Sequence, residues 1–144
     1  MKISAVIPAA GRGSRMGESG GIDKPYILLG DKPILAHTLI TLHASSIIDE
    51  IIIAVHSKYI KYCNDNIVKR YGLKNVKNVV KGEKTRLLSV YNGLKEVSLD
   101  SDLVLIHDGV RPFIDFKIIS RVIKEASSSG AAVAAVPERA TVKQ

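Results

Sequence analysis

Small and basic residues gather in one loop near the start of the chain. Residues 3–7 form an apolar, largely β-branched run that predicts a buried strand. Pro8 ends that run, and the Ala-Ala-Gly sequence of residues 9–11 follows with almost no side-chain bulk. A backbone exposed in this way can point several N–H groups at an anion, and Arg12 and Arg15 add positive charge. The loop therefore predicts a binding site for the phosphates of a nucleotide.

Three nucleotide-binding patterns can be compared with this loop. The dinucleotide fingerprint G-x-G-x-x-G accommodates Gly11 and Gly13, but Met16 stands where it requires a third glycine. A Walker P-loop is excluded because Gly11 is not followed by G-K-[ST] at the required spacing. The nucleotidyltransferase pattern A-A-G-x-G-x-R-M matches residues 9–16 at every fixed position, and Lys24 follows. A tight strand-to-helix turn with surface arginines is the alternative without a ligand, and the complete match disfavours it.

Strands and helices alternate along the chain. Apolar runs predict further strands at residues 51–55, 76–80, 103–106 and 131–136. Apolar residues at helical spacing predict helices over residues 34–45, 60–71, 87–97 and 118–126. Gly72 is expected to end the second helix as its C-cap. This alternation predicts an α/β fold with three layers and a largely parallel sheet, formed by a single domain over residues 1–144.

Two later segments carry residues suited to phosphate or metal chemistry. Residues 82–86 and residues 108–111 each follow a predicted strand, as the loop of residues 11–15 does. In open α/β sheets, ligands bind at the carboxyl ends of the strands. We therefore expect the three segments to converge on one edge of the sheet.

Composition narrows the classes of protein that fit. The net charge is +7, but no run of five or six basic residues occurs and no aromatic residues alternate with the lysines, so a nucleic-acid-binding protein is disfavoured. Apolar runs are far shorter than the roughly 18 residues that cross a bilayer, so we expect no membrane association. A cytoplasmic location is expected because no signal peptide precedes the first strand. Cys63 is the one cysteine, so an internal disulfide is excluded, and a packing role is expected for it.

Several motifs in a fixed order resemble one enzyme family. They are the loop of residues 9–16, Lys24-Pro25-Tyr26, Pro33-Ile34-Leu35, Arg86 with Ser89-Val90, and His107-Asp108-Gly109-Val110-Arg111-Pro112-Phe113. Together they resemble the 2-C-methyl-D-erythritol 4-phosphate cytidylyltransferases of non-mevalonate isoprenoid synthesis. The ribitol-5-phosphate cytidylyltransferases share most of them. The resemblance runs over residues 3–143 and implies a Rossmann-like nucleotidyltransferase fold. Because the family's enzymes are longer, it also implies that the chain corresponds to their N-terminal part and is truncated on its C-terminal side.

The resemblance implies a role for each motif in transferring a cytidylyl group from CTP to a sugar-alcohol phosphate, with release of pyrophosphate. Arg15 and Lys24 are expected to stabilise the transition state, and Asp108 to bind Mg²⁺. A helix cap or turn is the structural alternative for Asp108. Arg111 and Thr141 are expected to contact the substrate phosphate. The residues expected to bind CTP are Pro8, Ala9, Ala10, Gly11, Gly13, Gly82, Arg86 and Ser89.

Departures from the family pattern leave some alternatives open. Pro25 stands where the family more often has Gln, and Glu83 replaces the second of two glycines beside the base. The resemblance further implies a later lysine and a dimer-forming arm beyond Gln144, and hence a homodimer in the full-length form. We therefore expect this chain to bind CTP with Mg²⁺ but to turn over slowly. The alternatives are a ribitol-5-phosphate enzyme, an inactive CTP-binding fragment and, least favoured, an RNA-binding domain.

Overall fold

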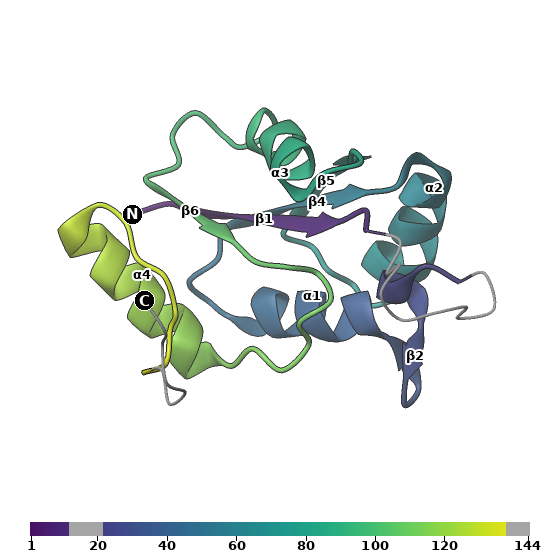
Figure 1. Cartoon of the computed structure of the whole chain (residues 1–144), viewed down its shortest axis with the longest axis horizontal. Helices are drawn as coiled ribbons and strands as arrows, with labels where there is room; N and C mark the ends of the chain where they lie inside the picture. Colours follow the sequence, from purple (N-terminus) through teal and green to yellow (C-terminus); the bar gives the residue numbers. More distant parts are fainter. Residues whose placement is uncertain (12–21, 138–144) are drawn as a thin grey trace, which may run out of the picture.

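Four parallel strands form the sheet of the computed structural model, which describes residues 1–11 and 22–137 (Figure 1). In the order β5-β4-β1-β6, they are Val76–Lys81, Glu50–Val55, Ile3–Ala9 and Leu103–Ile106. The two central strands, β1 and β4, are buried along their whole length, as their Ile, Val and Ala content requires. The predicted strands over these segments are confirmed.

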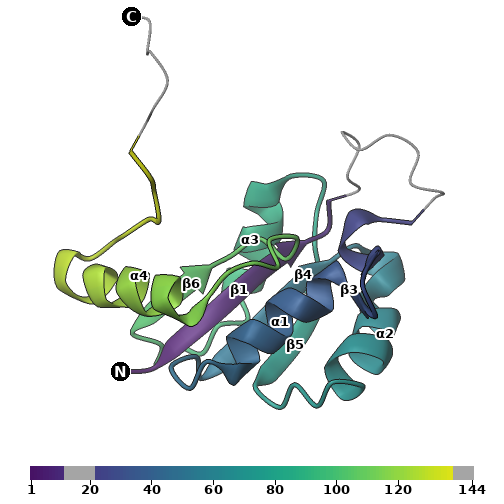
Figure 2. The ribbon, with the colours of Figure 1, turned by 90° about the horizontal axis from the view of Figure 1, so that it is seen from below.

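Helices cover both faces of the sheet and make the three predicted layers. Helix α3 (Arg86–Leu94) lies on one face, and α1 (Ile34–Ala44) and α4 (Phe116–Ser129) lie on the other (Figures 1 and 2). A small hairpin, β2 (Leu28–Leu29) with β3 (Lys32–Pro33), precedes α1. No helix within residues 1–11 and 22–137 is long and apolar enough to cross a membrane.

The main core lies between the sheet and the layer that contains α1. Leu35, Leu39 and Leu42 of α1 are fully buried against the isoleucines of β1 and β4, and Ile119 and Ile123 of α4 extend the same cluster. Fully burying one such side chain contributes roughly 1.5–3 kcal/mol. This core fixes the strands whose carboxyl ends carry the predicted site.

Helix α3 packs on the sheet through Val90 and two small residues, and only Val90 belongs to the apolar pattern read from the sequence. Ser89, Val90 and Gly93 are its buried positions, whereas Leu87 and Tyr91 are 76% and 55% exposed. A Cβ atom added at Gly93 would lie 2.5 Å from Val6 Cγ1 of β1. The helix therefore sits so close to the sheet at Gly93 that no side chain fits there, and Leu87 and Tyr91 face outward.

The segment from Ile60 to Gly72 is helical, as predicted, but not uniformly so. A 3₁₀ turn (Ser57–Tyr59) leads into the short helix α2 (Ile60–Cys63) and then into a π-helical stretch (Asn64–Lys69). Gly72 ends the segment with a φ of 61°, which confirms the predicted C-terminal glycine. Cys63 is fully buried, and burial raises the pKa of its thiol to about 12, so it packs as an apolar residue.

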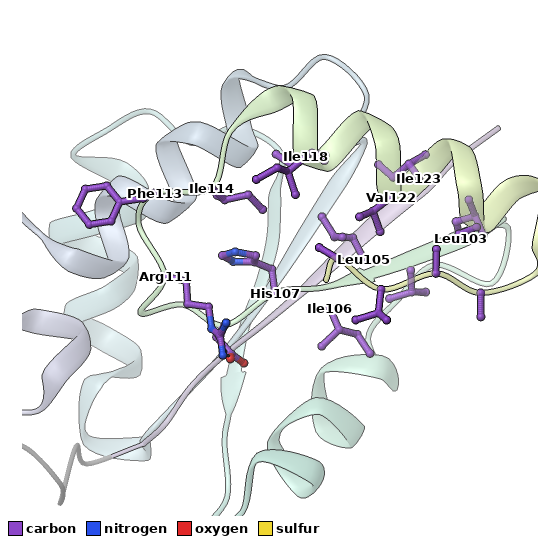
Figure 3. Close-up of a pocket in the computed structure, with 18 of the residues that line it drawn as sticks. Leu103, Leu105, Ile106, His107, Arg111, Phe113, Ile114, Ile118, Val122 and Ile123 are labelled. Atoms are coloured by element: carbon purple, nitrogen blue, oxygen red, sulfur yellow. Dashed lines mark hydrogen bonds and ion pairs between the residues drawn. The ribbon is translucent and has the colours of Figure 1, made fainter. Parts of the chain in front are cut away.

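The prediction of a fifth strand at residues 131–136 is wrong. These residues have no regular secondary structure, and Val133 and Val136 are each 86% exposed. A strand requires a neighbour to pair its N–H and C=O groups, and within the described residues none lies beside this segment. An apolar groove instead separates residues 130–134 from β6 and α4, lined by Leu105, Val122 and Ile123 among others (Figure 3).

A hydrogen-bond network around the Glu50 carboxylate lies at the amino-terminal ends of the strands, opposite the predicted site. Glu50 begins β4 and is 7% exposed. Its oxygens accept hydrogen bonds from Ser4 Oγ (2.6 Å), Ser98 N (2.7 Å) and Ser98 Oγ (2.6 Å). Burial alone would raise its pKa, but these hydrogen bonds and the nearby Lys77 lower the pKa to about 2. The network ties the loop between α3 and β6 to the two central strands.

Candidate active site

The carboxyl ends of the strands surround one pocket of about 880 Å³. Strand order reverses at β1, because β4 and β5 continue on one side of it and β6 lies on the other. Such switch points are where ligands bind in open α/β sheets, and the volume lies in the range of small-molecule sites. Pro8–Gly11 at the end of β1, Gly82–Arg86 after β5 and Asp108 after β6 all line the pocket, so the described parts of the three predicted segments converge there.

The end of β1 is held in place by close packing against the loop after β6. A Cβ atom added at Gly109 would lie 2.9 Å from both Ala9 Cβ and Leu35 Cδ1. The Gly109 N–H donates to the Pro8 carbonyl (3.1 Å), and the buried Thr38 hydroxyl donates to the Gly109 carbonyl (2.9 Å). Helix α1 thereby fixes the loop that carries Asp108 relative to the start of the glycine loop.

A second close approach shapes the pocket on the β5 side. The Gly82 N–H donates to the Val55 carbonyl (2.7 Å), and a Cβ atom at Gly82 would lie 2.5 Å from Ala10 Cβ. Ser89 Oγ accepts from the Glu83 N–H (2.9 Å) and lies within hydrogen-bonding distance of the Thr85 carbonyl (3.0 Å). Two residues predicted to bind CTP, Ala10 and Ser89, therefore pack closely around a third, Gly82.

Lys24 lines the pocket next to a turn that is anchored by the buried ring of Tyr26. It begins a 3₁₀ turn, Lys24–Tyr26, in which the Tyr26 N–H donates to the Asp23 carbonyl (2.9 Å). The Tyr26 ring is 7% exposed, and its centroid lies 3.9 Å from that of Tyr59. Lys58 pairs with Asp23 at 3.4 Å. Pro25, the departure from the family pattern, is buried at the second position of the turn, where its fixed φ is compatible with a helical conformation.

Asp108 pairs with two arginines from different segments. Its Oδ1 accepts from Arg86 Nε (2.7 Å), and its Oδ2 accepts from Arg111 Nε (3.1 Å). Asp108 does not cap a helix, since the N-cap of α4 is Asp115, whose side chain accepts from the Ile118 N–H. Asp108 does begin a turn, in which the Arg111 N–H donates to the Asp108 carbonyl (3.1 Å). The three charged residues that the sequence assigned to metal, nucleotide and substrate phosphate thus form one ionic cluster.

His107 faces the apolar side of the β6 loop. In Figure 3 its ring is directed toward the groove, on the opposite side of the chain from the Arg111 side chain. Burial lowers its pKa, which favours the neutral ring. Within the described residues, its Nδ1 is buried without a hydrogen-bond partner. The ring packs beside the site and does not line the pocket.

Several pocket residues were missed by the sequence analysis. His56 and Ser57 follow β4, the strand between β1 and β5, and Lys81 and Lys84 lie on the β5 side. The rule that ligands bind at strand ends, applied to residues 51–55 as well, identifies His56 and Ser57. The described lining includes four basic residues, Lys24, Lys81, Lys84 and Arg86, against the acidic Glu83 and Asp108. An excess of positive charge suits a polyphosphate.

Three of the predicted site residues lie outside the described part of the chain. Gly13, Arg15 and Thr141 fall within residues 12–21 and 138–144. Their roles stay predictions. The described residues that carry the candidate site are Lys24 and the remaining nine of the CTP, metal and phosphate sets, namely Pro8, Ala9, Ala10, Gly11, Gly82, Arg86, Ser89, Asp108 and Arg111. All but Arg111 line the pocket.

A known protein family matches nearly the whole chain. The family model described as 2-C-methyl-D-erythritol 4-phosphate cytidylyltransferase matches residues 3–144. The chain belongs to this family. Cytidylyltransferases with that name from Alkaliphilus metalliredigens and Geotalea uraniireducens are 46% and 43% identical to it, each over 99% of the chain. The chain spans 58% and 61% of the length of these two relatives.

Solved structures of cytidylyltransferases share the fold. The 4-diphosphocytidyl-2C-methyl-D-erythritol synthase of Anaerococcus prevotii superposes with a TM-score of 0.71 at 33% identity, over 88% of this chain and 51% of that protein. The bifunctional IspDF of Campylobacter jejuni superposes with a TM-score of 0.72 over 89% of this chain and 31% of that protein. At 21% identity, that second likeness concerns the fold alone.

Proposed function

We propose that this chain binds CTP in the pocket at the strand ends and transfers its cytidylyl group to 2-C-methyl-D-erythritol 4-phosphate, releasing pyrophosphate. Membership of the cytidylyltransferase family supports the proposal over the whole matched region. The observation that carries it is the pocket itself, where Pro8–Gly11, Gly82–Arg86 and Asp108 meet although they are far apart in the sequence.

The nucleotide is expected to lie with its base between β1 and β5. Ala10, Gly82 and Ser89 form a small-residue wall there, and backbone polar groups of the pocket would read the edge of a pyrimidine. The triphosphate then extends along Pro8–Gly11 toward Lys24. Backbone N–H groups and the lysine supply donors and charge for its oxygens.

In the proposed reaction, an oxygen of the acceptor phosphate forms a bond to the α-phosphorus of CTP. The bond from that phosphorus to the oxygen bridging to the β-phosphate breaks, and pyrophosphate leaves with the electron pair. The attacking phosphate is already ionised near neutral pH, so no strong general base is required. Lys24 would stabilise the charge that develops on the phosphoryl oxygens, and Arg111 would orient the acceptor phosphate.

Magnesium is proposed as the cofactor, with Asp108 as its protein ligand. Within residues 1–11 and 22–137, no cluster of three or more His, Cys, Asp or Glu residues forms a closed metal site. Mg²⁺ does not require one, because it is commonly bound by one or two carboxylates together with substrate phosphates and water. A single carboxylate beside a phosphate pocket fits that donor set. When bound, Mg²⁺ neutralises phosphate charge.

The acceptor is proposed from the family to which the chain belongs, and a direct assay separates it from ribitol 5-phosphate. Pyrophosphate release is measured with CTP and each acceptor, for this chain and for a longer form of the protein. We expect release with 2-C-methyl-D-erythritol 4-phosphate in the longer form, and slower release in this chain.

A matched pair of lysine variants tests the assignment of Lys24. Lys24→Gln should lower the rate of pyrophosphate release by about a hundredfold or more, since it removes a charge at the reacting phosphates. Lys69→Gln removes the same charge from an exposed residue that pairs with Asp65 away from the pocket, and should leave the rate unchanged. Equal rates for the two variants would contradict the assignment, and release with ribitol 5-phosphate alone would reassign the acceptor.

A further inference from the structure

Both carboxylate oxygens of Asp108 already carry a cationic partner. Arg86 is the first residue of α3 and reaches Oδ1, while Arg111 follows Asp108 by three residues and reaches Oδ2. The two guanidinium groups come from segments 22 and 3 residues away along the chain. A divalent cation approaching this carboxylate therefore meets positive charge on both oxygens.

The Asp108 side chain is much less exposed than the side chains of its two arginine partners. The Asp108 side chain is 23% exposed, whereas those of Arg86 and Arg111 are 61% and 74% exposed. Exposed arginines can swing away from the carboxylate at little cost, because ion pairs at the surface are weak. The backbone that carries the carboxylate is held more firmly, since the adjacent Gly109 is bonded to the Thr38 hydroxyl and to the Pro8 carbonyl.

The arginines also have donors to spare. Within the described part of the chain, their hydrogen bonds use Nε alone, with no hydrogen bond to the protein from either pair of terminal nitrogens. A guanidinium has five N–H donors and binds phosphate in a bidentate way. Arg86 lines the nucleotide pocket together with Asp108, so an incoming phosphate competes for the same guanidinium that the carboxylate holds.

We propose that Arg86 and Arg111 act as positioning residues that keep Asp108 closed to free divalent cations, and that a cation gains Asp108 when phosphates draw the guanidinium groups away. This inference rests on the proposed function, because it takes Asp108 as the metal ligand. The consequence is an order of events in which the metal enters with the nucleotide. In the absence of nucleotide, the two arginines pair with Asp108 beside the positions that the phosphates are proposed to occupy.

Binding of Mn²⁺ alone, without nucleotide, tests the proposal. Mn²⁺ accepts the same oxygen ligands as Mg²⁺, and its free form is counted by electron paramagnetic resonance. Removing one guanidinium removes both a competitor and a repulsive charge a few ångströms from the metal, so Arg111→Gln and Arg86→Gln should each tighten Mn²⁺ binding on the order of fivefold to tenfold. Arg121→Gln removes an equal charge from an exposed residue of α4 and should change the affinity less than twofold.

A double variant establishes whether the effect passes through Asp108. Asp108→Asn in the Arg111→Gln background should abolish the gain, because the amide keeps the shape but loses the charge. Wild-type Mn²⁺ affinity in both single arginine variants would overturn the proposal, as would weaker binding or a gain that survives Asp108→Asn. CTP binding and pyrophosphate release by the wild-type protein are measured separately. If the arginine variants do not change Mn²⁺ binding, the proposed function can still hold. If the wild-type protein neither binds CTP nor releases pyrophosphate, the proposed function is refuted whatever the Mn²⁺ result.

Discussion

Gly82→Ala is the substitution whose effect follows most directly from the packing at the site. The added methyl group would lie 2.5 Å from Ala10 Cβ, 3.2 Å from the Ala54 carbonyl oxygen and 3.2 Å from Ser89 Oγ. Carbon atoms in contact normally lie about 3.5–4.0 Å apart. The Ala10 backbone or the turn after β5 must therefore move by about 1 Å. Overpacking of this kind typically lowers the free energy of unfolding by about 1–3 kcal/mol.

The same displacement should weaken nucleotide binding. Ala10 and Ser89 line the wall on which the base is proposed to lie, and moving them apart removes at least one hydrogen bond to it. The loss of about 1.4 kcal/mol corresponds to a tenfold weaker affinity for CTP. Urea unfolding gives the change in stability, and isothermal titration calorimetry gives the affinity.

Gly11→Ala is the matched control for stability. It lies in the same pocket, but a Cβ atom there meets nothing within 4 Å among the described residues. We expect its unfolding free energy to stay within about 0.5 kcal/mol of wild type. If Gly82→Ala is as stable as Gly11→Ala and binds CTP as the wild type does, the account of a tightly packed base wall is refuted.

Three further predictions concern the parts that hold the site. Hydrogen bonds lower the pKa of Glu50 from 4.5 to about 2. The stabilisation should therefore be present in full above pH 4.5, and the free energy of unfolding should fall by on the order of 3 kcal/mol as the pH drops toward 2. Urea unfolding at each pH should show a flatter dependence for Glu50→Gln. Tyr26→Ala should lose about 3 kcal/mol with its packing on Tyr59, whereas Tyr26→Phe removes a buried hydroxyl without a partner in the described structure and should unfold at the same or higher urea concentration. Thr38→Val leaves the buried Gly109 carbonyl unpaired and should cost about 1–3 kcal/mol by the same measurement.

The strands and helices that depend on local pattern were predictable, and those that depend on a distant partner were not. Residues 51–55 are strand in both prediction and structure because a run of isoleucines is buried on both faces. Residues 131–136 have a similar apolar composition, but pairing is a non-local property, and within the described chain no strand lies beside them. Composition alone does not carry that information.

Helix faces were less predictable than helix positions. The apolar spacing of Leu87, Val90, Tyr91, Leu94 and Val97 indicated a helix, and a helix is there. Of these residues, Val90 is on the buried side, together with Ser89 and Gly93, which the apolar pattern did not include. Close approach to β1 at Val6 selects small residues, and a hydrophobic pattern gives them no weight. The π-helical stretch over Asn64–Lys69 is likewise invisible to apolar spacing.

For the site, the sequence predicted which segments meet, and the structure added what they touch. Gly82, Ser89 and Asp108 line one pocket because each follows a strand of the same parallel sheet. The pairing of Asp108 with Arg86 joins the loop after β6 to the start of α3, a non-local contact that residue spacing does not reveal. The contacts in the described loops explain the choice of Gly, Ala and Ser at positions where a motif records only the residue type.

The location of the nucleotide is the central claim, and amide chemical-shift mapping tests it most directly. A ¹⁵N-labelled sample is titrated with CTP and Mg²⁺, and with UTP and Mg²⁺ as the comparison. We expect CTP to shift the amide resonances of Ala10, Gly11, Gly82, Glu83 and Ser89 at lower concentration than UTP, with those of α4 unchanged. Shifts confined to α4 and residues 130–134, or no saturable shift at the strand ends, would contradict the assignment of this pocket as the CTP site.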